Sequence, residues 1–286
     1  MSKIFSPLAA AALAVAISTP ATADVVVGGI NFGVLGSTAH IETATLAETL
    51  VKSVGDKLEG YGLVTTINGA SSYCGVGSCS LYYHTYNYNV AAIGASKVQF
   101  TGGVIDIFLM AGAPINLFAQ NSLANLALIS TPGMTPWVRL TGHTFGDPLF
   151  VGILPTQTLN GEGSLTGASL SETGRGQLDV DTSNVFGLAA VSAYLNGNSI
   201  GDNLGGFADI VLTTSANNNV LNPFDELGGP AALAAGCKDG TAVSGKWCLQ
   251  GTLNTRGATV LLPEPTSLAL VGIALAGAGL VRRRRK

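Results

Sequence analysis

The last 24 residues most limit what this chain can fold into, because they set a separate segment apart from any folded body. The run begins with Pro263-Glu264-Pro265 and continues as an apolar stretch over residues 266–281. It closes with five cations, Arg282, Arg283, Arg284, Arg285 and Lys286. The two prolines favour an extended backbone, whereas an apolar segment ending in cations stops transfer through a membrane. We therefore expect a C-terminal transmembrane helix whose basic end stays in the cytoplasm.

The apolar segment is short for a stable span. Its core, residues 268–281, falls below the roughly 20 residues that a straight transmembrane helix needs. Arginine side chains can lengthen the effective span by reaching toward the membrane surface. A marginal span suits a segment that is held only until a protease removes it. The terminal block of cations argues against the alternative, a buried core helix.

The N-terminus has the three parts of a secretory signal peptide. Lys3 supplies positive charge, residues 8–17 are apolar, and Ala21-Thr22-Ala23 places small residues before Asp24. This combination favours cleavage between Ala23 and Asp24 over a buried N-terminal helix. The chain is thus expected to comprise a signal peptide (1–23), one extracytoplasmic domain (24–262) and a C-terminal membrane segment (263–286), whose role follows from the resemblance given below.

The remaining body is acidic. The chain has 14 basic and 17 acidic residues, and without Lys3, the five terminal cations and Glu264 the body keeps eight basic and sixteen acidic ones. A net charge near −8 repels nucleic acid, so nucleic-acid binding is not expected.

Short apolar runs separated by turn signals predict a mainly β body, either a β-sandwich or a jelly-roll-like fold. Three Asn-Gly pairs, at residues 68–69, 160–161 and 196–197, are typical of hairpin turns. Residues 38–54 fit either a strand or a helix, and their threonine content favours a strand. Residues 114–129 are the best helix candidate in the body.

Four cysteines in an exported chain predict disulfides. Cys74 and Cys79 close one short loop, and Cys237 and Cys248 close another. Four cysteines allow three connectivities, and the short loops favour local pairing. The wider second spacing argues against a structural zinc site.

Residues typical of catalysis are not clustered in the sequence. His40, His84 and His143 stand singly, and no nucleophile elbow, phosphate loop or dinucleotide fingerprint occurs. The run at residues 179–184 resembles the start of a calcium loop, but it lacks the glycine and glutamate of that motif. We therefore expect no metal, no cofactor and no enzymatic activity.

A tyrosine-rich run is the most distinctive feature of the body. Period-two spacing places Tyr82, Tyr86 and Tyr88 on one face of a strand, with Tyr83 opposite. Such a face could stack on sugar rings, or it could pack inside the fold.

The tail resembles the PEP-CTERM sorting signal of Gram-negative bacteria, which membrane proteases called exosortases recognise. The resemblance implies an exosortase partner, transient anchoring in the inner membrane, and delivery to the cell surface or extracellular matrix. It also implies an association with exopolysaccharide, biofilm or floc formation. Short stretches of the body, among them Gly60-Tyr61-Gly62-Leu63 and residues 176–180, resemble flocculation-associated PEP-CTERM proteins. The alternatives are a carbohydrate-binding module that uses the tyrosine face and, less favoured, a secreted hydrolase.

Overall fold

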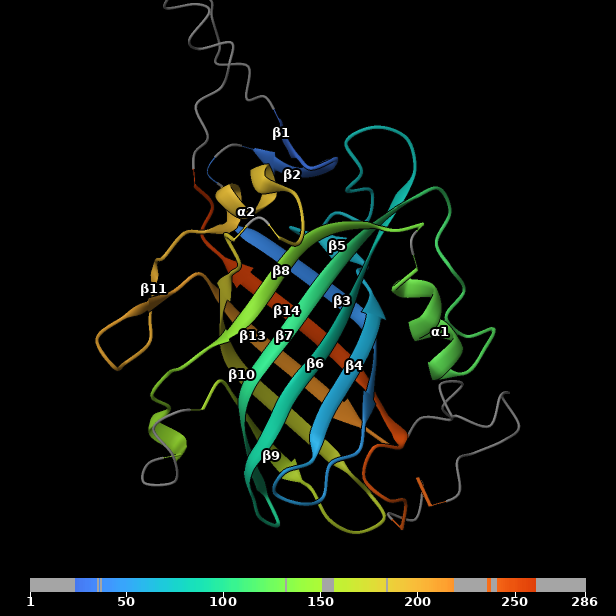
Figure 1. The fold of residues 1–286 in the computed structure, drawn as a ribbon, viewed down its shortest axis with the longest axis vertical. Coiled ribbons are helices and arrows are strands. Elements are labelled where there is room, and N and C mark those ends of the chain that lie inside the picture. The colour runs from blue at the N-terminus through green and yellow to red at the C-terminus, as the bar shows by residue number, and fades with distance from the viewer. Residues whose placement is uncertain are drawn as a thin grey trace, which may run out of the picture.

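The computed structural model describes residues 24–260, except residues 35, 37, 132, 151–156, 184, 219–235 and 238–240. The described part is mainly β (Figure 1). The strands are β1 (Asp24–Val27), β2 (Ile30–Val34), β3 (Ala39–Thr49), β4 (Lys57–Leu63), β5 (Thr66–Ile67), β6 (Cys79–Ile93), β7 (Lys97–Ala111), β8 (Thr135–His143), β9 (Leu159–Ser164), β10 (Ser171–Val180), β11 (Ile200–Gly201), β12 (Phe207–Ala208), β13 (Ile210–Asn217) and β14 (Trp247–Gly257). The helical segments are α1 (Ser122–Ile129), η1 (Pro148–Phe150) and α2 (Ala189–Leu195).

Eight antiparallel strands form a closed barrel. The order is β13-β14-β3-β4-β6-β7-β8-β10, and β10 pairs with β13 to complete the ring. This pairing is extensive, running from Ser171 opposite Asn217 to Leu178 opposite Ile210. The expected sandwich or jelly roll is therefore wrong, because the sheet closes on itself and leaves these strands no free edge.

One gap in the barrel wall is filled by two strands placed end to end. β8 pairs with residues 177–180 of β10, and β9 pairs with residues 171–176 of the same strand. On the other side of the gap, both strands pair with β7. β8 ends at His143 and β9 begins at Leu159, so both strands fill the same gap although residues 144–158 separate them in the sequence.

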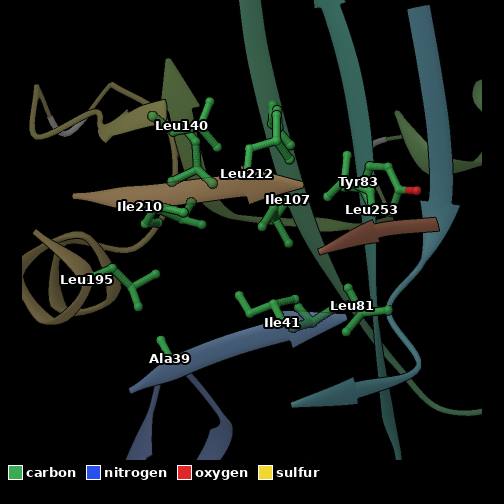
Figure 2. Close-up of a cluster of buried hydrophobic side chains, with 14 of the residues drawn as sticks. Ala39, Ile41, Leu81, Tyr83, Ile107, Leu140, Leu195, Ile210, Leu212 and Leu253 are labelled. Carbon is green, nitrogen blue, oxygen red and sulfur yellow. The ribbon is translucent and has the colours of Figure 1, made fainter. Parts of the chain in front are cut away.

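The barrel interior is a continuous apolar core. Figure 2 shows side chains from opposite walls pointing toward one another, including Ile41, Ile107, Leu140, Leu212 and Leu253. These five residues are at most 6% exposed. Burying one such side chain contributes about 1.5–3 kcal/mol, so this cluster is a principal source of stability.

Aromatic side chains seal one end of the barrel, which we call the capped end. β1, β2 and α2 lie across it (Figure 1). Phe32 of β2 lies between Trp137 and Tyr194, with ring centroids 6.2 Å and 4.9 Å away. The indole N–H of Trp137 donates a 3.1 Å hydrogen bond to the Gly28 carbonyl. The buried indole is thus both packed and hydrogen-bonded.

The opposite end, which we call the open end, has a less tightly filled interior. A cavity of about 20 Å³ lies among Leu50, Val98, Leu165, Leu170 and Glu172. A depression of about 330 Å³ shares Leu165 and Leu170 with that cavity. The Cys237–Cys248 disulfide lies in the apolar cluster beside Leu50 and Leu170.

Several local predictions are confirmed, and two are wrong. β3 occupies the ambiguous region, and α1 begins where the Asn121 side chain accepts a 2.9 Å hydrogen bond from the Ala124 N–H. Asn68 and Gly69 form a tight turn with φ values of 51° and 79°. The pair at residues 160–161 instead lies inside β9, where pairing with β10 overrides the local turn preference. Asn196 ends α2 and does not form a hairpin turn.

Candidate functional site

The tyrosine run does not keep the period-two alternation that the sequence predicts. Asn87 of β6 and Gly102 and Gly103 of β7 adopt positive φ values of 59°, 73° and 99°. Asn87 of β6 lies opposite these glycines of β7. At this point the inward and outward positions are exchanged along both strands. Gly103 is required for a second reason, because a methyl group there would lie 2.2 Å from the Tyr88 ring. The left-handed residues therefore turn Tyr88 into the barrel.

Of the two interpretations of the tyrosine run, sugar stacking is therefore wrong for Tyr82 and Tyr88, and packing within the fold is confirmed for both. Tyr88 is 1% exposed and packs edge-on against Phe100 in the core. Tyr82 points outward but is 0% exposed, because the segment containing α1 covers it, and its hydroxyl accepts a 2.6 Å hydrogen bond from the Ile115 N–H. Only Tyr86 is partly exposed.

Tyr86 belongs to a charged cluster on the outer wall. Arg139 binds Asp106 through two hydrogen bonds of 2.6 Å and 2.8 Å. The Tyr86 hydroxyl donates to Asp106 at 3.1 Å and accepts from Arg139 at 3.2 Å. The Arg139 guanidinium also lies 4.4 Å from the centre of the Phe186 ring. These contacts hold the Tyr86 ring in place and satisfy its hydroxyl within the wall.

A groove of about 520 Å³ on the outer wall was not predicted from the sequence. Its floor crosses three neighbouring strands, β3, β14 and β13, and Ile200 of β11 contributes to one side. The lining consists of Thr38, His40, Glu42, Ile200, Val211, Thr213, Asn254, Arg256, Gly257 and Ala258. Its volume lies within the range of small-molecule binding sites.

Strand register arranges the polar groups of the groove in two rows. His40 lies opposite Arg256, and Glu42 lies opposite Asn254, which in turn lies opposite Thr213. His40 Nε2 is 3.5 Å from Glu42 Oε1. Within the described part of the chain, the exposed Arg256 guanidinium has no ion-pair partner. The groove thus offers hydrogen-bond donors and acceptors side by side.

Two carboxyl groups lie inside the barrel toward the open end. Glu48 is 3% exposed, and both burial and the nearby Glu172 raise its pKa well above the usual value. Burial also raises the pKa of Glu172 to about 7. A methyl group at Gly60 would lie 2.8 Å from Thr85 Oγ1 and 3.1 Å from Glu48 Cγ, so the glycine makes room for this polar interior. Both carboxyls are held toward their neutral forms because the interior disfavours charge.

His143 has acidic partners that the sequence does not bring together. Its Nδ1 atom lies 2.7 Å from Asp179, and its Nε2 atom lies 3.3 Å from Asp202. Partial burial works to lower the pKa of His143, but these hydrogen bonds raise it overall. Asp181 accepts a 2.9 Å hydrogen bond from the Ser183 N–H, as in an ordinary polar turn. Among the described residues, no group of three or more potential metal ligands occurs.

Both local disulfides occur in the structure, as predicted. The Cα atoms are 5.7 Å apart in Cys74–Cys79 and 5.1 Å apart in Cys237–Cys248. The first disulfide closes a loop at the capped end, where Cys74 pairs with Ile30 of β2. Each disulfide therefore constrains a different end of the barrel.

The predicted targeting residues lie outside the described residues. These are Ala21 and Ala23 of the cleavage site, together with Pro263, Glu264, Pro265 and the terminal arginines. The predicted sorting helix lies there too. Within the described part, no helix has the length and apolarity needed to cross a membrane. Asp24 and Val260, the residues that border the two targeting segments, both lie at the capped end, where the Val260 N–H donates a 2.8 Å hydrogen bond to the Tyr194 carbonyl.

Comparison with known families identifies the tail. Residues 262–286 match the PEP-CTERM protein-sorting motif, so the chain carries this sorting signal at its C-terminus. The motif indicates export, processing by an exosortase and transient anchoring in a membrane. No curated protein and no solved structure matches the chain.

Proposed function

We propose that the mature protein is a non-enzymatic component of the cell surface or extracellular matrix of a Gram-negative bacterium, where it associates with exopolysaccharide in a biofilm or floc. The outer groove supports this proposal most directly. Sugar hydroxyls both donate and accept hydrogen bonds, and the groove presents Arg256, Asn254, Thr213 and Glu42 together. The sorting motif supports export of the protein, which would place this groove outside the cytoplasm.

The groove replaces the tyrosine face as the proposed saccharide contact. Tyr82 and Tyr88 are buried, and the Tyr86 hydroxyl is already bonded to Asp106 and Arg139. Hydrolysis is the less favoured function, because glycosidases generally need two carboxyl groups at the bond they cut. Glu42 is the one carboxylate in the groove lining, and the cavity beside Glu172 is too small for a sugar.

A binding experiment on the secreted mature protein tests the groove. Acidic and neutral polysaccharides from biofilm matrix would be titrated against wild type, Arg256→Ala and Asn254→Ala, with Lys57→Ala as a control for loss of an exposed cation away from the groove. We expect each groove variant to weaken binding about tenfold, equivalent to about 1.4 kcal/mol, and the control to leave binding unchanged. Equal binding by all variants would exclude the groove. New reducing ends in the polysaccharide would instead support hydrolysis.

The processing step has a separate test. Glu264 is the only charged group in the Pro-Glu-Pro triplet, and we propose that the exosortase recognises its carboxylate. Glu264→Ala should leave export intact but leave the uncleaved precursor in the inner membrane. Deleting residues 282–286 should instead release unprocessed protein. Intact-mass measurement of cell fractions distinguishes these outcomes, and normal cleavage of Glu264→Ala would contradict recognition through that residue.

A further inference from the structure

The capped end lies close to the point at which the precursor enters the membrane. Val260 is hydrogen-bonded to α2 at this end, and the matched sorting motif begins at residue 262. Three fully extended residues span at most about 10 Å, so Pro263 cannot lie far from Val260. β1, which begins at Asp24, packs at the same end. A precursor anchored by its sorting signal must therefore hold the capped end near the membrane.

The chemistry of the capped end is consistent with that position. The segments that leave the barrel at this end, residues 24–38, 64–78, 112–134, 181–209 and 258–260, contain no lysine or arginine. They contain four acidic residues, of which Asp202 and Asp209 are only 6% and 2% exposed, Asp181 is half-buried and Asp24 is exposed. The lack of cations and the burial of Asp202 and Asp209 therefore limit the charge that lipid contact must desolvate at this end.

Exposed valines extend from the same surface. Val26, Val34 and Val76 are 51%, 49% and 93% exposed. The loop that carries Val76 is closed by the Cys74–Cys79 disulfide, and it is fixed to the β1–β2 hairpin because the Gly75 N–H donates a 2.8 Å hydrogen bond to the Gly29 carbonyl. The exposed valines of the hairpin and the loop are thus held on one rigid unit.

We propose that the capped end is the membrane-facing surface of the anchored precursor, and that Val26, Val34 and Val76 contact lipid there. This inference rests on the transient membrane anchoring that the sorting motif indicates. Short tethering determines which end faces the membrane, and the cation-free, valine-bearing surface makes that contact favourable. Cleavage by the exosortase then frees the same surface.

Photo-crosslinking of the full-length precursor tests this orientation. Benzoylphenylalanine would replace Val76 in one variant and Val54 in the other, in cells that lack the exosortase so that the precursor stays intact. Val54 is the matched control, because it is a 65% exposed valine in the connection between β3 and β4 at the open end. We expect lipid adducts at position 76 to exceed those at position 54 at least tenfold. A six-residue Gly-Ser insertion after Val260 should reduce this difference.

The outcomes separate this inference from the sorting function. A membrane-bound precursor with equal lipid labelling at both positions would overturn the orientation alone. Adducts of position 76 with a protein instead of lipid would overturn lipid contact. A precursor absent from the membrane fraction would overturn both the anchoring and the orientation.

Discussion

The two ends of the barrel are built on different principles. At the capped end, Phe32, Trp137 and Tyr194 fill the interior with aromatic rings. Toward the open end, the interior contains Glu48 and Glu172 and a small cavity. The connections of the capped end carry no cation, whereas those of the open end include Lys52 and Lys246. The comparison separates a tightly packed end whose connections carry no cation from a polar, less completely filled one.

The largest expected difference between the ends concerns packing. Trp137→Ala should lower the free energy of unfolding by about 3–5 kcal/mol, because it removes a fully buried indole and its hydrogen bond to Gly28. Leu165→Ala, at the partly buried rim of the open end, should cost about 1–2 kcal/mol. Urea unfolding of both variants measures the difference. Equal losses would contradict the distinction between the ends.

Removing each disulfide should have the next largest effect. The chain-entropy relation gives about 2 kcal/mol for the Cys74–Cys79 loop and about 3 kcal/mol for the longer Cys237–Cys248 loop. Paired Cys→Ser variants, compared by urea unfolding, test whether the open end depends more on its cross-link. Peptide mapping without reduction checks the pairing, and a peptide joining Cys74 to Cys237 or Cys248 would show that it is wrong.

The open end should also give the barrel a pH dependence. Carboxyls whose pKa is raised by folding hold protons that the unfolded chain has already released. Stability should therefore decline as the pH rises from about 4.5, the ordinary glutamate pKa, through about 7, the pKa of Glu172. The urea midpoint of wild type should fall across this range, and that of Glu48→Gln should fall less. Glu59→Gln, on the outer wall, is the control that should behave as wild type.

The smallest expected effect on stability concerns His143, which links Asp202 in the connection at residues 181–209 to the barrel wall. The raised pKa of His143 adds stability that is present below about 6.5 and is lost as the pH rises through the folded-state pKa. His143→Gln should cost less than about 1 kcal/mol at pH 5.5 and have less effect at pH 8.5. Thermal unfolding at the two pH values measures the stability that His143→Gln removes. A larger loss at pH 8.5 than at pH 5.5 would contradict a stabilising role for protonated His143.

Local features were predictable from the sequence, and closure of the sheet was not. The Asn68-Gly69 turn, α1 and the two short disulfide loops each depend on neighbouring residues. Barrel closure depends on the pairing of β10 with β13, whose register the local pattern does not specify. The change of face in the tyrosine run depends on Asn87 and its glycine partners across the ladder.

The candidate site was the least predictable feature. Its residues come from positions 38–42, 200, 211–213 and 254–258, and only the strand register brings them together. No spacing in the linear sequence marks such a groove. The processing signal, in contrast, is contiguous and could be recognised from its residues alone.

The position of β14 makes the order of synthesis important for folding. β14 is the last strand of the barrel, and it fills the space between β3, near the start of the body, and β13. It ends at Gly257, five residues before the sorting motif begins at residue 262. The ring can therefore close only when almost the whole body has been translocated. A chain truncated before β14 would have two unpaired edges, at β3 and β13, which are templates for aggregation. The final strand thus couples completion of export to removal of the last aggregation-prone edge.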